Sequence, residues 1–130
     1  MEPDAASTRF ARGLAQYKKV YGDGAVVMEQ GQADFFDLMI EHLFGEVWAR
    51  PGLEVDQRRL IVMGVLAAQH HFATLQIQFA RALDAGELTP EQVREVVIQL
   101  VPYVGYPSSS DLFRVGEAAI AGHGAGGDGR

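Results

Sequence analysis

Apolar residues recur along most of this chain at the three- and four-residue spacing of an amphipathic helix. No segment shows the sustained alternation of apolar and polar residues that a half-buried strand gives. The pattern predicts an all-α protein, a compact bundle of about six helices. Phe10, Leu14 and Tyr17 form the inward stripe of a first helix over residues 7–20, and the glycines that follow predict a loop over 21–31.

Local signals set the limits of the next helices. A second helix over 32–48 must end before Pro51, because the residue preceding a proline avoids the α region. A third helix over 56–69 is apolar on nearly every side. We therefore expect it at the centre of the bundle, with Arg58 and Arg59 on its solvated surface.

The second half of the chain carries clearer signals. A fourth helix over 73–84 is followed by Gly86 as its C′ residue. A fifth helix over 90–103 follows a Thr89 cap, with proline at the first helical position and glutamine three residues after the cap. A last helix is predicted to start within Ser108–Ser110.

The chain is expected to form one domain over residues 1–120, since 130 residues suffice for a single ordinary core. Residues 121–130 hold five glycines in ten positions and almost nothing to bury. We expect this segment to be a disordered tail.

Composition and charge narrow the classes of function. The chain has 11 Lys and Arg against 17 Asp and Glu, a net charge of -6, so it lacks the positive charge that nucleic acids and anionic membranes select. It has no cysteine, which excludes thiol redox chemistry, disulfide scaffolds and thiolate zinc sites. The acidic N-terminus shows no signal-peptide pattern and no apolar run is long enough to span a membrane. We therefore expect a cytoplasmic, soluble protein.

Three segments in order carry a resemblance to a known family: GEVWARPGL at 45–53, ARALDAG at 80–86, and LTPEQVREVVIQLVPYVGYP at 88–107. Together they resemble the carboxymuconolactone decarboxylase family over residues 9–120. The resemblance implies a small all-helical protomer in a homo-oligomer, a trimer or hexamer, with pockets near the subunit contacts. It also implies a small-molecule substrate and no metal or organic cofactor. The thiol-bearing branch of the family is excluded by the lack of cysteine.

The chain departs from the family pattern on the predicted fourth helix. The decarboxylases have a glutamate there, followed four residues later by a histidine, and these positions are Thr74 and Gln78 in this chain. Loss of carbon dioxide leaves a carbanion that must be reprotonated, and a group whose pKa lies near the working pH does this best. Neither a hydroxyl nor a carboxamide has such a pKa. This departure has three possible meanings. The protein has lost decarboxylation, it decarboxylates with other groups, or it catalyses a reaction that needs only positioning and hydrogen bonds.

Three residues are candidate catalytic groups. His70 and His71 lie in the predicted turn before the fourth helix, and either could supply the missing acid or base, because histidine titrates near neutrality. The alternative is a pair of turn histidines half in solvent. Glu46 lies one turn from Arg50, a spacing that also fits a surface ion pair. No metal site is predicted, since adjacent histidines without carboxylate spacing do not make one.

Other residues are candidates for substrate binding. Gln78 lies on an apolar stripe and therefore needs a hydrogen-bond partner, either a ligand or another helix. The planar guanidinium of Arg50 suits a substrate carboxylate. Trp48 fits a pocket wall or a subunit contact equally. The remaining candidates are Thr74, His42 and Tyr103, of which the tyrosine also fits a half-buried plug.

Two functions follow from these observations. The first is a cofactor-independent carboxy-lyase, or a related isomerase or cyclase, acting on a small, cyclic and carboxylated molecule. The second is a non-catalytic member of the family that binds a small molecule or serves as an oligomeric scaffold.

Overall fold

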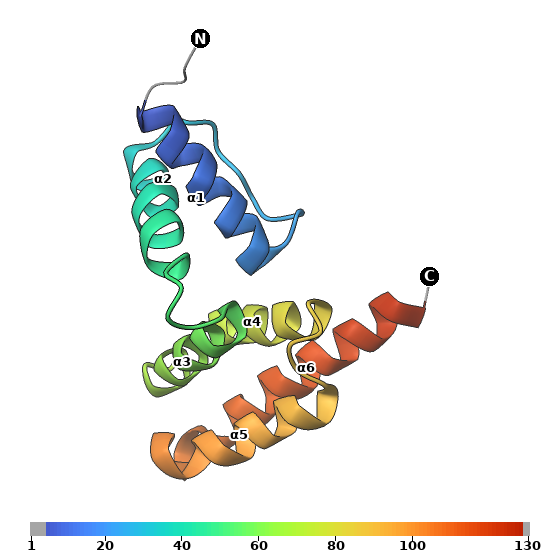
Figure 1. Ribbon diagram of the computed structural model, residues 1–130. Helices are drawn as coiled ribbons and strands as arrows, with labels where there is room; N and C mark the ends of the chain where they lie inside the picture. Colours follow the sequence, from blue (N-terminus) through green and yellow to red (C-terminus); the bar gives the residue numbers. More distant parts are fainter. Residues whose placement is uncertain (1–4, 129–130) are drawn as a thin grey trace. The chain divides into compact units, whose positions relative to one another are not determined.

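The computed structural model describes residues 5–128, which form helices, turns and loops with no strand among them (Figure 1). The predicted all-α class is confirmed. No helix in this range is long and apolar enough to cross a membrane. The elements in chain order are α1 Ala5–Tyr21, α2 Asp34–Leu38, the π-helix η1 Met39–Trp48, α3 Val55–Ala68, α4 Phe72–Asp84, α5 Pro90–Val104, the 3-10 turn η2 Tyr106–Ser108, and α6 Ser109–Asp128.

The chain divides into two compact units, residues 1–55 and residues 56–130. The first unit contains α1, α2 and η1, and the second contains α3 to α6. The single domain that the sequence predicts over residues 1–120 stays a prediction. Each unit is described by itself below.

In the first unit, α1 packs against η1 through a very close approach of the two backbones. A Cβ placed on Gly13 would lie 1.9 Å from the carbonyl oxygen of Ile40, so glycine is required at this contact. An aromatic cluster completes the core beside it. Tyr17 packs edge-on against Phe44, with ring centroids 5.0 Å apart, and donates its hydroxyl to the carbonyl of Val26 at 2.7 Å.

The second predicted helix has the expected extent but a different geometry. A short α-helix, α2, continues directly into ten residues of π-helix that end at Trp48. In a π-helix each N–H bonds to the carbonyl five residues back, which widens the turn. The buried side chains of η1 recur every four residues, at Ile40, Phe44 and Trp48. This spacing places one apolar stripe toward α1.

In the second unit, α6 packs against α4 and α5 around an apolar core. The predicted cap of α5 is confirmed, because Thr89 and Gln92 form a reciprocal capping box. Gly86 has φ +73, as its C′ position after α4 requires. The largest fully buried apolar side chains of this core are Phe79, Met63, Leu75, Leu112, Val93 and Val115.

Two expectations about α3 are wrong. Leu60, Ile61 and Val65 are 45%, 57% and 49% exposed, so α3 is not surrounded by other helices. Arg59, expected on the solvated surface, is completely buried. The reason is the spacing along the helix. Arg59 lies one turn before Met63 and two turns before Ala67, so all three side chains share the face of α3 that is turned to the core.

The glycine-rich end of the chain also differs from expectation. The structure extends α6 through residues 121–128, where the sequence predicts a disordered tail, while residues 129–130 lie outside the described range. His123 explains part of this order, because its Nδ1 lies 3.2 Å from Oδ1 of Asp84 at the end of α4. Burial of Ala119 against α4 helps to hold the preceding turn.

Candidate active site on helix α4

A polar stripe follows one face of α4 from its N-terminus into the core. His71 is the N-cap residue of α4, and Thr74 and Gln78 follow it at the spacing that places residues on one helix face. His71 and Thr74 are exposed, whereas Gln78 is only 1% exposed. The first turn of α4 has no side-chain cap, so its backbone N–H groups favour an anion near His71.

His70 is held in an unusual backbone conformation in the turn before α4. Its φ is +62, the left-handed region that non-glycine residues rarely adopt. Its ring stacks on Phe72, with centroids 5.6 Å apart, and its Nε2 lies 3.4 Å from the hydroxyl of Ser108. The turn between α3 and α4 is therefore tied to the turn between α5 and α6. Both predicted histidines lie in this tight turn, as the sequence indicates.

The inner end of the stripe is a buried network that joins α3, α4 and the loop after α4. Arg59 donates from Nη1 to Oε1 of Gln78 at 2.9 Å. It also holds Glu87 with both atoms of one guanidinium edge, from Nε at 2.6 Å and from Nη2 at 3.1 Å. The side chains of Arg59 and Glu87 are 1% and 14% exposed. Their opposite charges cancel inside the protein, which makes burial of the guanidinium possible.

This network assigns a partner to Gln78. The sequence requires a hydrogen-bond partner at this position and leaves open whether a ligand or another helix supplies it. The structure provides an inter-helix bond to Arg59. Arg59 and Glu87 were missed by the sequence reasoning, although the shared face of Arg59, Met63 and Ala67 was a usable signal.

Two candidates of the first unit, His42 and Glu46, form an exposed cluster on η1 with Arg9 of α1. His42 Nδ1 lies 3.0 Å from Oε1 of Glu46, and Arg9 Nη2 donates to Oε2 of Glu46 at 3.3 Å. Arg9 also lies 4.0 Å from Glu41. The hydrogen bond from His42, together with the charge of Arg9, lowers the pKa of Glu46 below its usual value. Glu46 is therefore an ionised carboxylate near neutrality.

The other predicted site residues have different surroundings. Trp48 is 7% exposed and stacks on Phe44 inside the first unit, with ring centroids 6.2 Å apart. Arg50 is exposed just after η1. Tyr103, on the last turn of α5, is 84% exposed, so it does not plug the core. No group of three or more His, Asp and Glu side chains suited to a metal occurs between residues 5 and 128.

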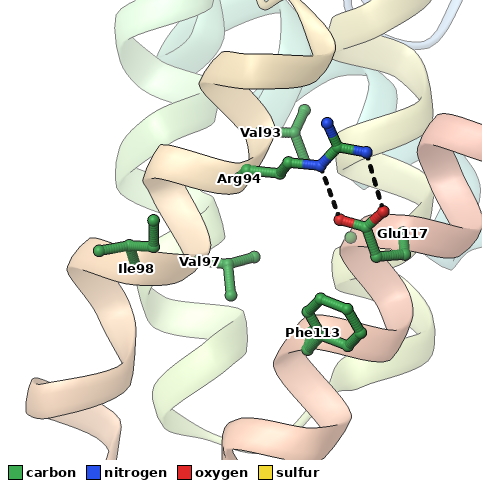
Figure 2. Close-up of a pocket in the computed structure, with 7 residues that line it drawn as sticks. Val93, Arg94, Val97, Ile98, Phe113 and Glu117 are labelled. Carbon is green, nitrogen blue, oxygen red and sulfur yellow. Dashed lines mark hydrogen bonds and ion pairs between the residues drawn. The ribbon is translucent and has the colours of Figure 1, made fainter.

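A cavity between α5 and α6 was not predicted from the sequence. It has a volume of about 420 Å³ and a mostly apolar wall, within the range of small-molecule pockets (Figure 2). Arg94 and Glu117 face each other across it, with Nε and Nη2 of Arg94 donating to the carboxylate at 2.9 and 3.0 Å. This ion pair lowers the pKa of Glu117. The lining residues are Val93, Arg94, Val97, Ile98, Phe113, Gly116 and Glu117.

Comparison with known proteins identifies the family. The model of the carboxymuconolactone decarboxylase family matches residues 33–118, so the chain belongs to this family, as its sequence motifs indicate. A nitrosuccinic acid decarboxylase of Metarhizium robertsii is 32% identical over 116 residues, covering 85% of this chain and 80% of the relative. A 4-carboxymuconolactone decarboxylase of Acinetobacter baylyi is 26% identical over 114 residues, covering 84% of each. No solved structure is significantly similar to the chain.

Proposed function

We propose that this protein is a carboxy-lyase that works without a cofactor on a small carboxylated molecule, and that the carboxylate it removes is adjacent to an electron-withdrawing group. Membership of the family, and two relatives named as decarboxylases, support the lyase class. We infer the substrate class from the surroundings of the Gln78 side chain. By the family resemblance it stands at the position of the family histidine, and in the structure it is buried and accepts a hydrogen bond from Arg59.

The chemistry explains why a neutral side chain at this position selects the substrate. When the bond to the carboxylate breaks, carbon dioxide leaves and the electron pair stays on the remaining carbon. A carboxamide has no pKa near neutrality, so Gln78 does not reprotonate that carbon. The substrate must then stabilise the electron pair itself. A nitro group beside the carboxylate does so by taking the charge onto its oxygens, and nitrosuccinic acid, named for the Metarhizium relative, carries such a group.

The outer end of the α4 stripe supplies the remaining roles. The N-terminus of α4 and the hydroxyl of Thr74 favour the anionic substrate by hydrogen bonding. We assign proton donation to His71, because it is the N-cap residue of α4 and lies on the same helix face as Thr74 and Gln78. His70 orients the turn through Phe72 and Ser108. Both histidines are exposed to solvent.

This site is built from the second unit alone. The roles expected from the sequence for residues of the first unit stay predictions: proton transfer by Glu46, carboxylate binding by Arg50, and substrate contact by His42 and Trp48. Tyr103, although in the second unit, likewise stays a prediction. So do the homo-oligomeric state, the cytoplasmic location and independence from cofactors.

A direct assay tests the proposal. Purified protein is mixed with nitrosuccinic acid, or with succinic acid as a control that lacks the nitro group, and carbon dioxide release is followed. We expect the protein to release carbon dioxide faster than buffer does from nitrosuccinic acid but not from succinic acid, because only the nitro acid stabilises its own carbanion. The variant His71→Gln should lower kcat about 100-fold, the usual contribution of a general acid.

A matched control separates this role from a general effect of losing a histidine. His123→Gln removes an imidazole that contacts Asp84 at the opposite end of α4, and it should leave kcat unchanged. Equal losses in the two variants would remove His71 from the mechanism. No release from either acid would remove the decarboxylase assignment.

A second function is favoured by one feature of the same site. The hydrogen bond between Gln78 and Arg59 is complete within the protein, which suits a structural role and a pocket that binds without turnover. In that case, calorimetry would show saturable binding of the nitro acid while no carbon dioxide is released.

A further inference from the structure

The cavity between α5 and α6 is separate from the site on α4. All the residues that line it belong to α5 or α6, so it shares no side chain with the α4 stripe. Its volume of about 420 Å³ is large enough for an aromatic molecule of one or two rings. The chemistry of its ligand is set by the cavity wall and by the few polar groups at its edge.

The wall of the cavity favours an aromatic ligand. Val97 is 9% exposed and forms the floor, whereas Ile98 and Phe113 are 61% and 62% exposed at its sides. The same three residues also line a neighbouring hollow of about 530 Å³ that reaches Tyr106. Aromatic rings that stack edge-on or offset gain free energy beyond the area that they bury. The ring of Phe113 therefore favours a flat aromatic molecule over an aliphatic one.

The polar edge of the cavity is the ion pair between Arg94 and Glu117 (Figure 2). The two hydrogen bonds of the pair use two of the five guanidinium N–H groups and one lone pair on each carboxylate oxygen. The side chains of Arg94 and Glu117 are 50% and 33% exposed, so their other donors and lone pairs can reach a ligand. The guanidinium can only donate, and the carboxylate, whose pKa is lowered by the pair, can only accept.

These two side chains favour a ligand group that both donates and accepts a hydrogen bond. A carboxylate has no hydrogen for Glu117 and is repelled by its charge, and an ammonium group has no acceptor for Arg94. An aromatic hydroxyl meets both needs with one oxygen, because its hydrogen can go to Glu117 while its lone pair accepts from Arg94. It also carries no charge near neutrality, which suits an ion pair whose local charge is zero.

We propose that this cavity binds a neutral phenol, with its ring against Phe113 and Ile98 and its hydroxyl at the edge of the Arg94–Glu117 pair. Binding leaves the ion pair in place and adds one hydrogen bond to each of its members. No bond of the phenol is made or broken. The proposal is independent of the decarboxylase assignment, since it uses no residue of α4.

Titration of the protein with 2-naphthol at neutral pH tests the proposal. NMR spectra of the valine and isoleucine methyl groups should show saturable shifts at Val97 and Ile98, with a dissociation constant on the order of 0.1 mM for a ligand of this size. Two related compounds test the hydroxyl: 2-methoxynaphthalene lacks the hydrogen, and 2-naphthoic acid is a carboxylate. Each should bind about 10-fold more weakly or less, the usual effect of losing a hydrogen bond to a charged group.

A substitution in the pair tests the contact itself. In Glu117→Leu the preference for 2-naphthol over 2-methoxynaphthalene should disappear, while the far-UV circular dichroism stays unchanged because the pair is partly exposed. Asp111→Leu is the matched control, since it removes a carboxylate of α6 that pairs with Arg114 and does not line the cavity. This variant should keep the full preference for 2-naphthol.

Several results would overturn the proposal. One is a protein that does not bind 2-naphthol, and another is one whose methyl shifts lie away from Val97 and Ile98. Binding of 2-naphthoic acid as tight as that of 2-naphthol would also contradict it. So would a preference for the hydroxyl that persists in Glu117→Leu, or one that is lost equally in Asp111→Leu.

Discussion

Arg59 connects the fold of the second unit with its candidate site. Its guanidinium is buried between Glu87, which neutralises its charge, and Gln78, whose oxygen it fixes. A buried ion pair of this kind contributes little net stability against an apolar replacement, but loss of one partner leaves an uncompensated charge. The carboxamide of Gln78 is therefore held in one orientation by the hydrogen bond from Arg59 on α3.

Removal of the Glu87 carboxylate tests whether the buried charge of Arg59 needs a negative partner. Glu87→Gln leaves the charge of Arg59 buried and should lower the free energy of unfolding by about 3 kcal/mol. Chemical denaturation followed by circular dichroism measures the loss. Asp111→Asn is the matched control, because it breaks an exposed pair with Arg114 and should cost less than about 1 kcal/mol. Equal losses in the two variants would show that the buried network is not special.

For this network, the sequence predicted that Gln78 needs a partner but not which residue the partner is. The need of Gln78 for a partner followed from a polar residue on an apolar stripe. The partner did not follow, because Arg59 stands beside Arg58 and charged pairs usually mark a solvated surface. Glu87 is far from Arg59 in sequence, and only the folded chain brings the two carboxylate oxygens to the guanidinium.

At the level of elements, α1 and η1 can pack closely only because residue 13 of α1 is glycine and has no side chain. Gly13 lets the backbone of α1 approach the carbonyl of Ile40, and η1 is a π-helix at this point. Gly13→Ala requires the helices to separate and should lower the free energy of unfolding of the first unit by about 3 kcal/mol. The fluorescence of Trp48, the single tryptophan, reports unfolding of this unit.

Gly24→Ala is the control for that variant. A Cβ at Gly24 meets nothing within 4 Å and its φ is not positive, so the change should be close to neutral. An alanine at position 13 that is equally neutral would mean that α1 and η1 do not approach each other as described.

The helices differed in how well their sequences predicted them. The limits of α4 and α5 followed from Gly86 and the Thr89 capping box, which are local signals with local physical causes. The π-helical geometry of η1 could not be predicted, because a stripe repeating every four residues fits either helix type. The extension of α6 beyond residue 120 depends on Asp84 and on packing against α4, and neither is visible in a glycine-rich segment.

On the scale of the whole molecule, the chain is an all-α member of its family, and the reaction proposed for it depends on the side chains of α4. The family model spans both compact units, whereas the α4 site draws its residues from the second unit alone. A shared fold does not fix a shared reaction, since function resides in the site. In the function proposed above, the neutral side chains of Thr74 and Gln78 determine which acids the protein would decarboxylate.

The ratio of two specificity constants tests that statement most directly. In one carbon dioxide assay, kcat/KM is measured for nitrosuccinic acid and for 4-carboxymuconolactone with the same preparation. The account predicts that kcat/KM for the nitro acid exceeds kcat/KM for the lactone by about 100-fold or more, because the nitro group holds the electron pair on the substrate itself while the uncharged Gln78 gives the carbanion no proton. A kcat/KM for the lactone equal to or above that for the nitro acid would contradict it.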